Sequence, residues 1–322
     1  MPNKWRAASS ISALGAGDDL VLPFQIEGMD VRGRLVRLGS SVDQVLSAHS
    51  YPEPVSALLG EALVLAAMLG AALKFDGLFT VQAQGNGPVS LLVADFEAEE
   101  GGPGRLRGYA AFDRRRVADL QERAPQKITL PELLGDGSLA LTIDPRLDRD
   151  RYQGIVPLEG LTLSECARVY FDRSEQIPTF VALAVARHYA QGGIAAWRAG
   201  GLLVQSVATA GGFGAPQTRK DEDDWTRAML LARTIETDEL VDPLLSPERL
   251  LLRLFHEDGV RVFDPFAVAF GCRCNRGKVE AVLATYPRET LSEMVESDGQ
   301  IRARCEFCNT EYAFELDALT QS

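Results

Sequence analysis

Residues 272–274 read Cys-Arg-Cys and residues 305–308 read Cys-Glu-Phe-Cys, with thirty residues between the two pairs. Four of the five cysteines of the chain lie in these two short motifs. Two cysteine pairs separated by such a loop can form a tetrahedral thiolate site, because each pair supplies two adjacent ligands and the chain between them folds around the metal. The spacing therefore predicts one zinc per chain, bound by Cys272, Cys274, Cys305 and Cys308.

The same four sulfurs could instead form two local disulfides, and Cys-X-Cys is less usual than Cys-X-X-Cys in a structural zinc ribbon. A zinc site here could be an inert clamp or an oxidation switch, because zinc keeps thiolates deprotonated and the thiolate is the form that oxidants attack. Four arginines flank the pairs and could hold the thiolate charge if zinc leaves: Arg273, Arg276, Arg302 and Arg304. Spacing alone favours the inert clamp.

Length and composition limit the possible functions. At 322 residues, with 46% hydrophobic residues, the chain is expected to form about two domains with a sizeable core. A net charge of -12 disfavours binding to nucleic acid. The longest apolar run, residues 62–73, is too short to span a bilayer, and residues 1–20 do not resemble a signal peptide. We therefore expect a cytoplasmic protein with no membrane partner, in a reducing compartment where clustered cysteines favour metal binding or redox sensing.

The first two thirds of the chain predict an α+β fold. A helix that begins near Pro52 and continues to Leu73 is apolar nearly all round, so it should be buried. Short strand-like runs follow one another through turns such as Gly85-Asn86-Gly87-Pro88, which predicts an antiparallel or mixed sheet with helices packed on it. We assign residues 1–210 to this domain, with strands at 20–26, 31–38, 79–84, 89–94, 106–112, 139–143 and 201–205.

Residues 211–262 are predicted to form a charged helical linker region. It starts with the glycine-rich stretch 211–216, and a later helix has Ser246 as N-cap and Pro247 in its first turn. The helices are short and amphipathic, so they need a neighbour to be stable. Their apolar stripes are a candidate linker or client-binding surface: Trp225, Met229, Ile235, Leu250, Leu251, Leu254 and Phe255.

The third predicted domain, residues 263–322, carries the cysteine pairs. Asn275 is placed to cap a helix, and strands are expected at 301–305 and 312–314. A segment of this size rarely folds securely on its own apolar core, so zinc could supply much of its stability, on the order of 10–16 kcal/mol.

No catalytic constellation is evident in the sequence. Cys166 lies in an apolar helical stretch and is expected to be a buried core thiol. The three histidines have no nucleophile near them in sequence, and the glycines at 85–87 are not followed by the lysine of a phosphate loop. We therefore expect a protein that is not an enzyme.

Several motifs resemble one family. The cysteine spacing, together with the sequence Ser-Glu-Gln-Ile-Pro-Thr at 174–179, is similar to that of the heat shock protein 33 family of redox-regulated bacterial holdases. The resemblance covers nearly the whole chain and includes residues 51–55, 58–61, 73–77, 82–88, 151–154, 170–176, 200–205 and 254–257.

The resemblance implies an ATP-independent chaperone that is inactive while Cys272, Cys274, Cys305 and Cys308 hold zinc. Under oxidative stress, Cys272 would pair with Cys274 and Cys305 with Cys308, zinc would leave, and the C-terminal domain would unfold and loosen the linker. Oxidised subunits would dimerise and hold unfolding client proteins. The resemblance thus favours the oxidation switch over the clamp.

Two alternatives belong to other classes. A zinc-ribbon module that binds nucleic acid or a transcription complex is disfavoured by the acidic charge and the scarcity of aromatic and basic pairs. A thiol oxidoreductase would need an exposed Cys-X-X-Cys of low pKa at a helix start, whereas Cys305 follows a predicted strand.

Overall fold

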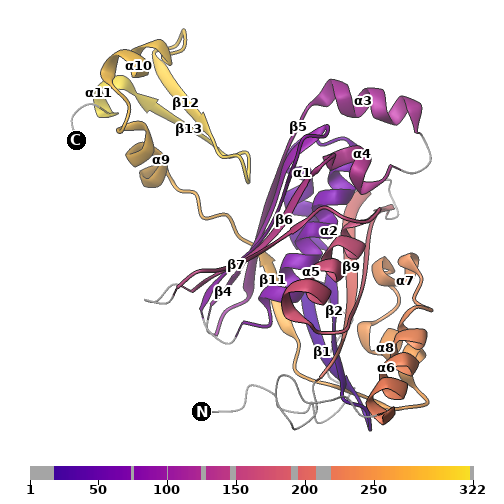
Figure 1. Cartoon of the computed structure of the whole chain (residues 1–322). Coiled ribbons are helices and arrows are strands. Elements are labelled where there is room, and N and C mark those ends of the chain that lie inside the picture. The colour runs from indigo at the N-terminus through magenta and orange to yellow at the C-terminus, as the bar shows by residue number, and fades with distance from the viewer. Residues whose placement is uncertain are drawn as a thin grey trace. The chain divides into compact units, whose positions relative to one another are not determined.

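The computed structural model describes residues 18–73, 76–99, 101–124, 128–145, 150–189, 195–207 and 219–319, and for 219–221 it describes the backbone alone. The chain divides into two compact units, Met1–Phe270 and Gly271–Ser322. The elements of both are labelled in Figure 1.

An eleven-stranded sheet forms the framework of the first unit. The strand order is β7-β6-β3-β4-β5-β11-β1-β2-β9-β8, and β10 pairs with β1 off this path. Among the described strands, the pair β11–β5 is parallel and the other pairs are antiparallel. The bounds are β1 Leu20–Ile26, β2 Val31–Leu38, β3 Gly77–Gly85, β4 Val89–Ala98, β5 Gly104–Phe112, β6 Gly137–Pro145, β7 Tyr152–Pro157, β8 Thr179–Tyr189, β9 Ala195–Ser206, β10 Val260–Val262 and β11 Phe266–Phe270.

This mixed sheet and the α+β class agree with the sequence analysis. The turn at 85–88 joins β3 to β4, and Gln82 pairs with Val93 across the hairpin. Strands β7, β8, β10 and β11 were not predicted. In β8, three alanines at positions 182, 184 and 186 weaken the strand propensity, and pairing with β9 along its whole length makes the strand.

Helix α2, Glu53–Gly70, is the buried helix that the sequence predicts. It contacts strands from both halves of the sheet, including β3, β4, β5, β8 and β9. By length and composition it could cross a membrane, but 78% of it is buried inside the protein, so it is a core helix. The other helices of this part are α1 Ser40–Ser47, α3 Arg114–Arg123, α4 Leu130–Leu134, α5 Leu163–Tyr170 and a π-helical turn at Phe171–Glu175.

The half of the sheet made of β1, β2, β9 and β8 is covered on both faces. Successive residues of a strand point to opposite faces. Leu203 packs in the cluster that includes α2, whereas its neighbour Leu202 packs in a second cluster with the linker helices. Burial on both faces explains the nearly continuous apolar run in β9.

The linker helices α6 Arg219–Ala232, α7 Thr237–Val241 and α8 Pro247–Phe255 supply that second cover (Figure 1). The predicted cap of α8 is confirmed, because Ser246 Oγ accepts a hydrogen bond from the Arg249 amide. At Gly200 a side chain could not fit, since its Cβ would lie 2.1 Å from the Leu240 carbonyl oxygen. The glycine-rich start of the linker, residues 211–216, lies outside the described residues.

The second unit is small. It contains α9 Arg276–Leu283, α10 Arg288–Glu293, the hairpin of β12 Gln300–Arg304 and β13 Glu311–Glu315, and α11 Leu316–Leu319. The predicted cap is present, because Asn275 Oδ1 accepts a hydrogen bond from the Lys278 amide. Its buried apolar cluster comprises Leu283, Leu291, Ile301, Phe314 and Leu319.

The division between the units falls later in the chain than the sequence boundary at 262. Strand β11 pairs with β1 and β5 and therefore belongs to the first unit. Cys272 follows the end of β11 by two residues.

Candidate metal centre and linker surface

The four predicted zinc ligands lie together in the second unit. The Sγ atoms of Cys272, Cys274, Cys305 and Cys308 are all within 4.8 Å of one another. The Sγ–Sγ distance is 3.7 Å between Cys272 and Cys305 and 3.3 Å between Cys274 and Cys308. A tetrahedron with metal–sulfur bonds of about 2.3 Å has edges of about 3.8 Å. The cluster therefore has the size of a tetrahedral thiolate site.

The second cysteine pair is shaped by a tight turn after β12. The Asn309 amide donates to the Cys305 carbonyl at 2.8 Å, and the Cys305 amide donates to the Thr310 carbonyl at 2.9 Å. Asn309 has a φ of 58°, in the left-handed region that asparagine tolerates better than most residues. This turn brings Cys308 back beside Cys305.

The first pair is fixed by the start of α9 and by β13. Asn275 caps α9 immediately after Cys274, so the helix begins next to the ligand. The hydroxyl group of Tyr312 donates to Cys274 Sγ at 3.2 Å. This hydrogen bond is the main cause that raises the pKa of Tyr312 to about 12. An O–H donor directed at sulfur stabilises the thiolate form.

Three of the four thiols have a pKa above the ordinary value of a cysteine. Burial raises the pKa of Cys272, Cys274 and Cys305. Burial would also raise the pKa of Cys308, but hydrogen bonds with Thr310 and with the neighbouring thiols outweigh it and lower that pKa to about 7. A bound divalent cation is what can keep all four sulfurs ionised near neutral pH, because metal binding displaces the thiol protons. The donor set thus fits a metal that prefers sulfur.

The arginines beside the cysteine pairs are engaged with other groups. Their described partners are carboxylates or an aromatic ring: Arg302 pairs with Asp298, Arg304 pairs with Glu311, and the Arg276 guanidinium lies 4.4 Å from the Phe314 ring centroid. In the folded unit these three cations therefore stabilise the hairpin and its core and do not contact the thiols.

The fifth cysteine is a core residue, as predicted. Cys166 on α5 is fully buried, and its Sγ lies 3.8 Å from the Pro157 carbonyl oxygen. Burial raises the pKa of this thiol. Cys166 is therefore shielded from oxidants in the folded first unit.

The predicted linker surface is covered in this structure. Phe255 is fully buried and stacks on Phe24 of β1, with ring centroids 5.7 Å apart. Met229 is half-buried on α6. The other five residues pack in the same apolar cluster as Phe255. Leu250, Leu251 and Leu254 are buried in it, and Trp225 and Ile235 are partly buried. In this folded state the stripes form a core between linker and sheet.

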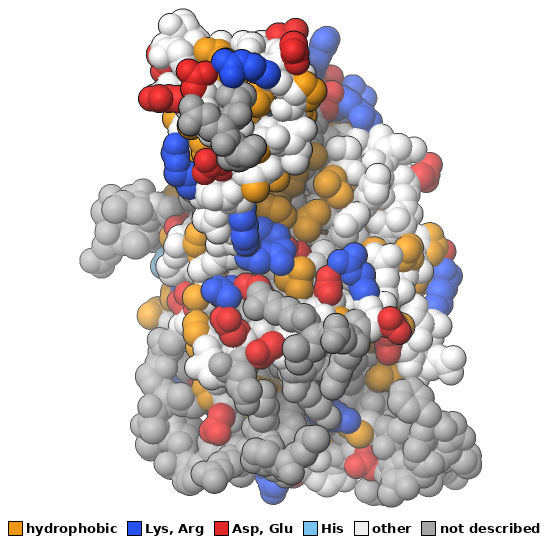
Figure 2. Space-filling model, turned by 90° about the vertical axis from the view of Figure 1, so that its left-hand side faces the viewer, with side chains coloured by type: hydrophobic (Ala, Val, Ile, Leu, Met, Phe, Trp, Pro, Cys, Tyr) orange, Lys and Arg blue, Asp and Glu red, His pale blue; other side chains and the backbone are white. Residues whose placement is uncertain are grey.

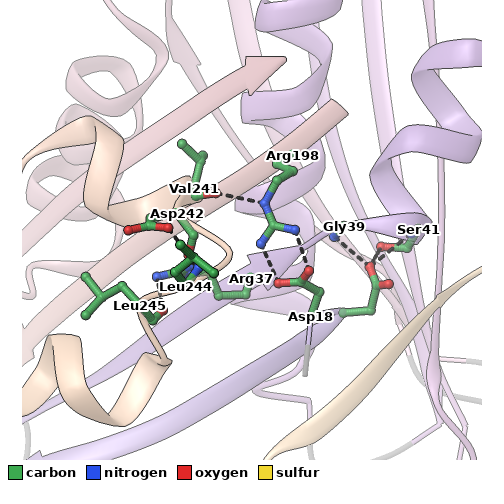
Figure 3. A network of polar contacts seen from close by, with 10 residues as sticks. Asp18, Arg37, Gly39, Ser41, Arg198, Val241, Asp242, Leu244 and Leu245 are labelled. Atoms are coloured by element: carbon green, nitrogen blue, oxygen red, sulfur yellow. Dashed lines mark hydrogen bonds and ion pairs between the residues drawn. The ribbon is translucent and has the colours of Figure 1, made fainter. Parts of the chain in front are cut away.

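Two buried arginines, which the sequence analysis did not single out, hold the linker (Figure 3). Arg37 of β2 donates to three linker carbonyls, and Arg198 of β9 donates to a fourth and binds the Asp18 carboxylate. The carbonyl acceptors of Arg37 are Glu239 at 2.7 Å, Leu245 at 2.9 Å and Asp242, and that of Arg198 is Val241 at 2.7 Å. All four lie in α7 or in the segment between α7 and α8.

Burial of the charged Arg37 guanidinium would be unfavourable without these hydrogen-bond acceptors. Its side chain is 2% exposed, and burial, followed by the charge of Arg198, lowers its pKa. A buried cation must find partners, and here the linker backbone provides them. The signal in the sequence is a charge within the run Leu35-Val36-Arg37-Leu38, in a strand that is otherwise apolar at that end.

Charged side chains of both signs lie on the described residues drawn in Figure 2. Among these residues, Lys and Arg side chains are interspersed with Asp and Glu, and hydrophobic side chains lie between them.

Comparisons with known proteins decide the family. The sequence profile described as "Hsp33 protein" matches residues 19–315. The chain belongs to the Hsp33 family. A protein named 33 kDa chaperonin from Caulobacter vibrioides is 46% identical over 301 residues, which are 94% of this chain and 96% of that protein. Another with the same name, from Cronobacter sakazakii, is 39% identical over 300 residues, or 93% of each chain.

The fold of Hsp33 is also seen in a solved structure. The crystal structure of a 33 kDa chaperonin (heat shock protein 33 homolog) from Thermotoga maritima superposes with a TM-score of 0.74. It is 24% identical in sequence, and the match covers 94% of this chain and 97% of that one. This likeness supports the α+β architecture described above.

As a member of the Hsp33 family, this chain is a redox-regulated holdase chaperone and not an enzyme. Hsp33 is a family of soluble bacterial chaperones that act on client proteins. Redox regulation of the family disfavours the inert clamp that cysteine spacing alone suggested. Spacing reports which ligands can meet, but it does not report what happens when they are oxidised.

Proposed function

We propose that one zinc ion, bound by Cys272, Cys274, Cys305 and Cys308, keeps this cytoplasmic chaperone inactive. The support is the cluster itself, in which four thiols lie within 4.8 Å of one another. Zinc prefers four thiolates in a tetrahedral arrangement when its role is structural. The zinc would hold both cysteine pairs and the elements next to them, α9 and β12.

Oxidation would form the disulfides Cys272–Cys274 and Cys305–Cys308. Each disulfide forms from two thiols and one hydrogen peroxide, which takes up the two electrons and leaves as two waters. The short Sγ–Sγ distances join cysteines of different pairs, 272 with 305 and 274 with 308. The local pairing rests on sequence proximity, because residues two or three apart stay within reach of each other once the unit unfolds. Peptide mapping of the oxidised protein distinguishes local from crossed bridges.

Loss of the metal would unfold the second unit and loosen the linker. The second unit has a small apolar cluster, so its folding free energy depends on zinc. Cys272 follows the end of β11 by two residues, and β11 pairs with β1, the strand that also packs against α8 through Phe24. Fraying of β11 would weaken the surface on which the linker rests.

A loosened linker would expose two apolar surfaces for client proteins. One is the set of stripes on α6 and α8, and the other is the face of β1, β2, β9 and β8 that the stripes cover. Exposed apolar surface of this extent is typical of protein interaction sites. We expect oxidised subunits to dimerise through part of it and to hold unfolding clients with the remainder.

The experiment is light scattering of a thermally unfolding client protein. The zinc-bound reduced chain should not suppress aggregation, and the peroxide-treated chain should suppress it without ATP. Equal suppression by both forms would show that oxidation does not control activity. Elemental analysis of the reduced protein should find one zinc per chain, and a value near zero would contradict the metal assignment.

A further inference from the structure

Asp18, two residues before β1, reaches the linker through one arginine (Figure 3). Its two carboxylate oxygens accept hydrogen bonds from the two terminal nitrogens of Arg198, and Arg198 Nε donates to the Val241 carbonyl of the linker at 2.7 Å. A bidentate carboxylate fixes the plane of a guanidinium group, so Asp18 directs Nε at the linker. Gly39 permits this approach, because a Cβ at position 39 would lie 2.9 Å from the Asp18 Cβ.

The Asp18 carboxylate also compensates positive charge under the linker. Arg198 and Arg37 are both buried, and strand pairing places them on the same face of the sheet. Burial, and then the charge of Arg198, lowers the pKa of Arg37, whereas the charge of Asp18 raises it. Two neighbouring buried cations are unfavourable without a compensating carboxylate. Loss of the Asp18 charge should therefore favour the undocked linker, in which water reaches both guanidinium groups.

The backbone of Asp19 holds Asp18 in place. Its φ is 66°, in the left-handed region that residues other than glycine rarely adopt. Asp19 Oδ1 accepts hydrogen bonds from the Gly39 amide at 2.9 Å, and from the amide, at 3.0 Å, and the hydroxyl group of Ser41. The Asp19 carbonyl oxygen accepts one from the Val268 amide of β11 at 2.8 Å. A strained conformation persists only while such contacts maintain it. Fraying of β11 would let residue 19 relax and turn the Asp18 carboxylate away from its arginine.

We propose that Asp18 is a positioning residue of the zinc switch: it keeps the linker docked through Arg198, and β11 controls it through Asp19. This role rests on the proposed function, in which zinc release frays β11. While β11 is paired, the carboxylate and the guanidinium group stay bound to each other. Once β11 frays, Arg198 is left buried without its carboxylate, and the linker undocks. This polar route acts on α7 and the segment after it, whereas the apolar stripe acts on α8.

Hydrogen exchange of residues 237–245 in the reduced, zinc-bound protein tests the arginine contact. Asp18→Asn keeps the shape of the side chain and removes its charge, so exchange should become about tenfold faster. Asp18→Glu keeps a carboxylate and should restore part of the protection. Asp30→Asn is the matched control, because Asp30 is an exposed residue of the turn between β1 and β2, and its rates should equal those of the wild type. Unchanged rates in Asp18→Asn, or no rescue by Asp18→Glu, would overturn the proposal.

A double-mutant cycle shows whether Asp18 acts through Arg198. Arg198→Gln removes the carboxylate contact and the bond to the Val241 carbonyl together. The double variant Asp18→Asn/Arg198→Gln should therefore exchange no faster than Arg198→Gln alone. If the two effects multiply, Asp18 acts by another route and the proposed role is wrong.

The contact with β11 is tested by Val268→Pro, which removes the amide that bonds to the Asp19 carbonyl. With zinc bound, exchange of residues 237–245 should become about tenfold faster, and addition of Asp18→Asn should change it no further. Asp19→Ala takes its place if Val268→Pro loses zinc, because alanine disfavours the left-handed conformation and leaves β11 unaltered. Wild-type rates in the variant that retains zinc would show that β11 does not control Asp18.

These measurements separate the role of Asp18 from the zinc switch itself. Each uses reduced protein whose zinc content is checked by elemental analysis, so a negative result leaves the oxidation switch untouched. Failure of the switch would instead be seen as linker protection that survives oxidation in the wild type.

Discussion

The two units of this chaperone are stabilised by different means. The first has large apolar clusters on both faces of one half of its sheet, with α2 buried on one side and the linker helices on the other. The second has five buried apolar side chains and four clustered thiols among its described residues. An apolar core cannot be oxidised away, whereas a thiolate site can. We therefore expect an oxidant to act on the second unit and spare the first.

The largest effect should come from removing the metal ligands. Cys272→Ser/Cys305→Ser leaves two thiols, and structural zinc sites contribute on the order of 10–16 kcal/mol. We expect residues 271–319 to unfold while the sheet of the first unit keeps its protection, as seen by limited proteolysis with mass spectrometry. Cys166→Ser serves as the control, since this buried thiol lies in the first unit. A double variant with a folded second unit would show that its apolar core is sufficient.

A smaller effect should follow from changes in the linker core. Leu251→Ser/Phe255→Ser removes two buried side chains, and each such loss costs about 2–5 kcal/mol. The linker should undock, so aggregation of a client should be suppressed before oxidation, although client affinity could fall. Leu252→Ser is the matched control, because Leu252 on the same helix is 55% exposed. If the double variant needs peroxide as the wild type does, docking of this helix does not restrain activity.

The buried arginine should matter less than the apolar stripe. Arg37→Ala removes three hydrogen bonds to linker carbonyls, and hydrogen bonds to charged groups contribute about 1.5–3 kcal/mol each. Hydrogen exchange of residues 237–255 should become faster in the reduced protein. Arg32→Ala, an exposed position on the same strand, should leave the exchange rates unchanged. Unaltered exchange in Arg37→Ala would mean that the stripes alone dock the linker.

The smallest expected effect is a pH dependence of the first unit. The pKa of Glu61 is raised from 4.5 to about 7, so the folded state binds more protons than the unfolded state between these values. Its contribution to the free energy of unfolding is therefore full below pH 4.5 and is lost as the pH rises through 7. Between pH 5 and pH 8 the wild type should lose about 1–3 kcal/mol that Glu61→Gln does not lose. Urea unfolding curves of both proteins check this, and parallel pH profiles would contradict it.

Local patterns predicted much of the fold. The all-round apolar helix, the hairpin at 85–88 and the caps at Ser246 and Asn275 depend on residues near one another in sequence, so they could be read directly. Strand β11 could not be predicted from local sequence, because it forms by pairing with β5, which lies more than 150 residues earlier in the chain. That long-range pairing also moves the division between the units from 262 to 270.

The residues of the candidate site also divide into those that could be predicted from the sequence and those that could not. The four cysteines could be named from spacing, since thiols in paired motifs have few other uses. The groups that hold the linker could not be predicted from the sequence. Arg37 and Arg198 bind backbone carbonyls, which every residue type has, so no sequence pattern marks them. The partial signal was the presence of Arg37 in the otherwise apolar end of β2, which predicts a buried partner without naming it.

Hydrogen exchange of the zinc-bound reduced protein and of the fully oxidised protein tests whether zinc release undocks the linker. We predict that protection is lost across residues 271–319 and across the linker, 219–262, while α2 and strands β3, β4 and β5 remain protected. If protection of the linker is the same in both forms, zinc release is not transmitted to the linker and the activating surface lies elsewhere.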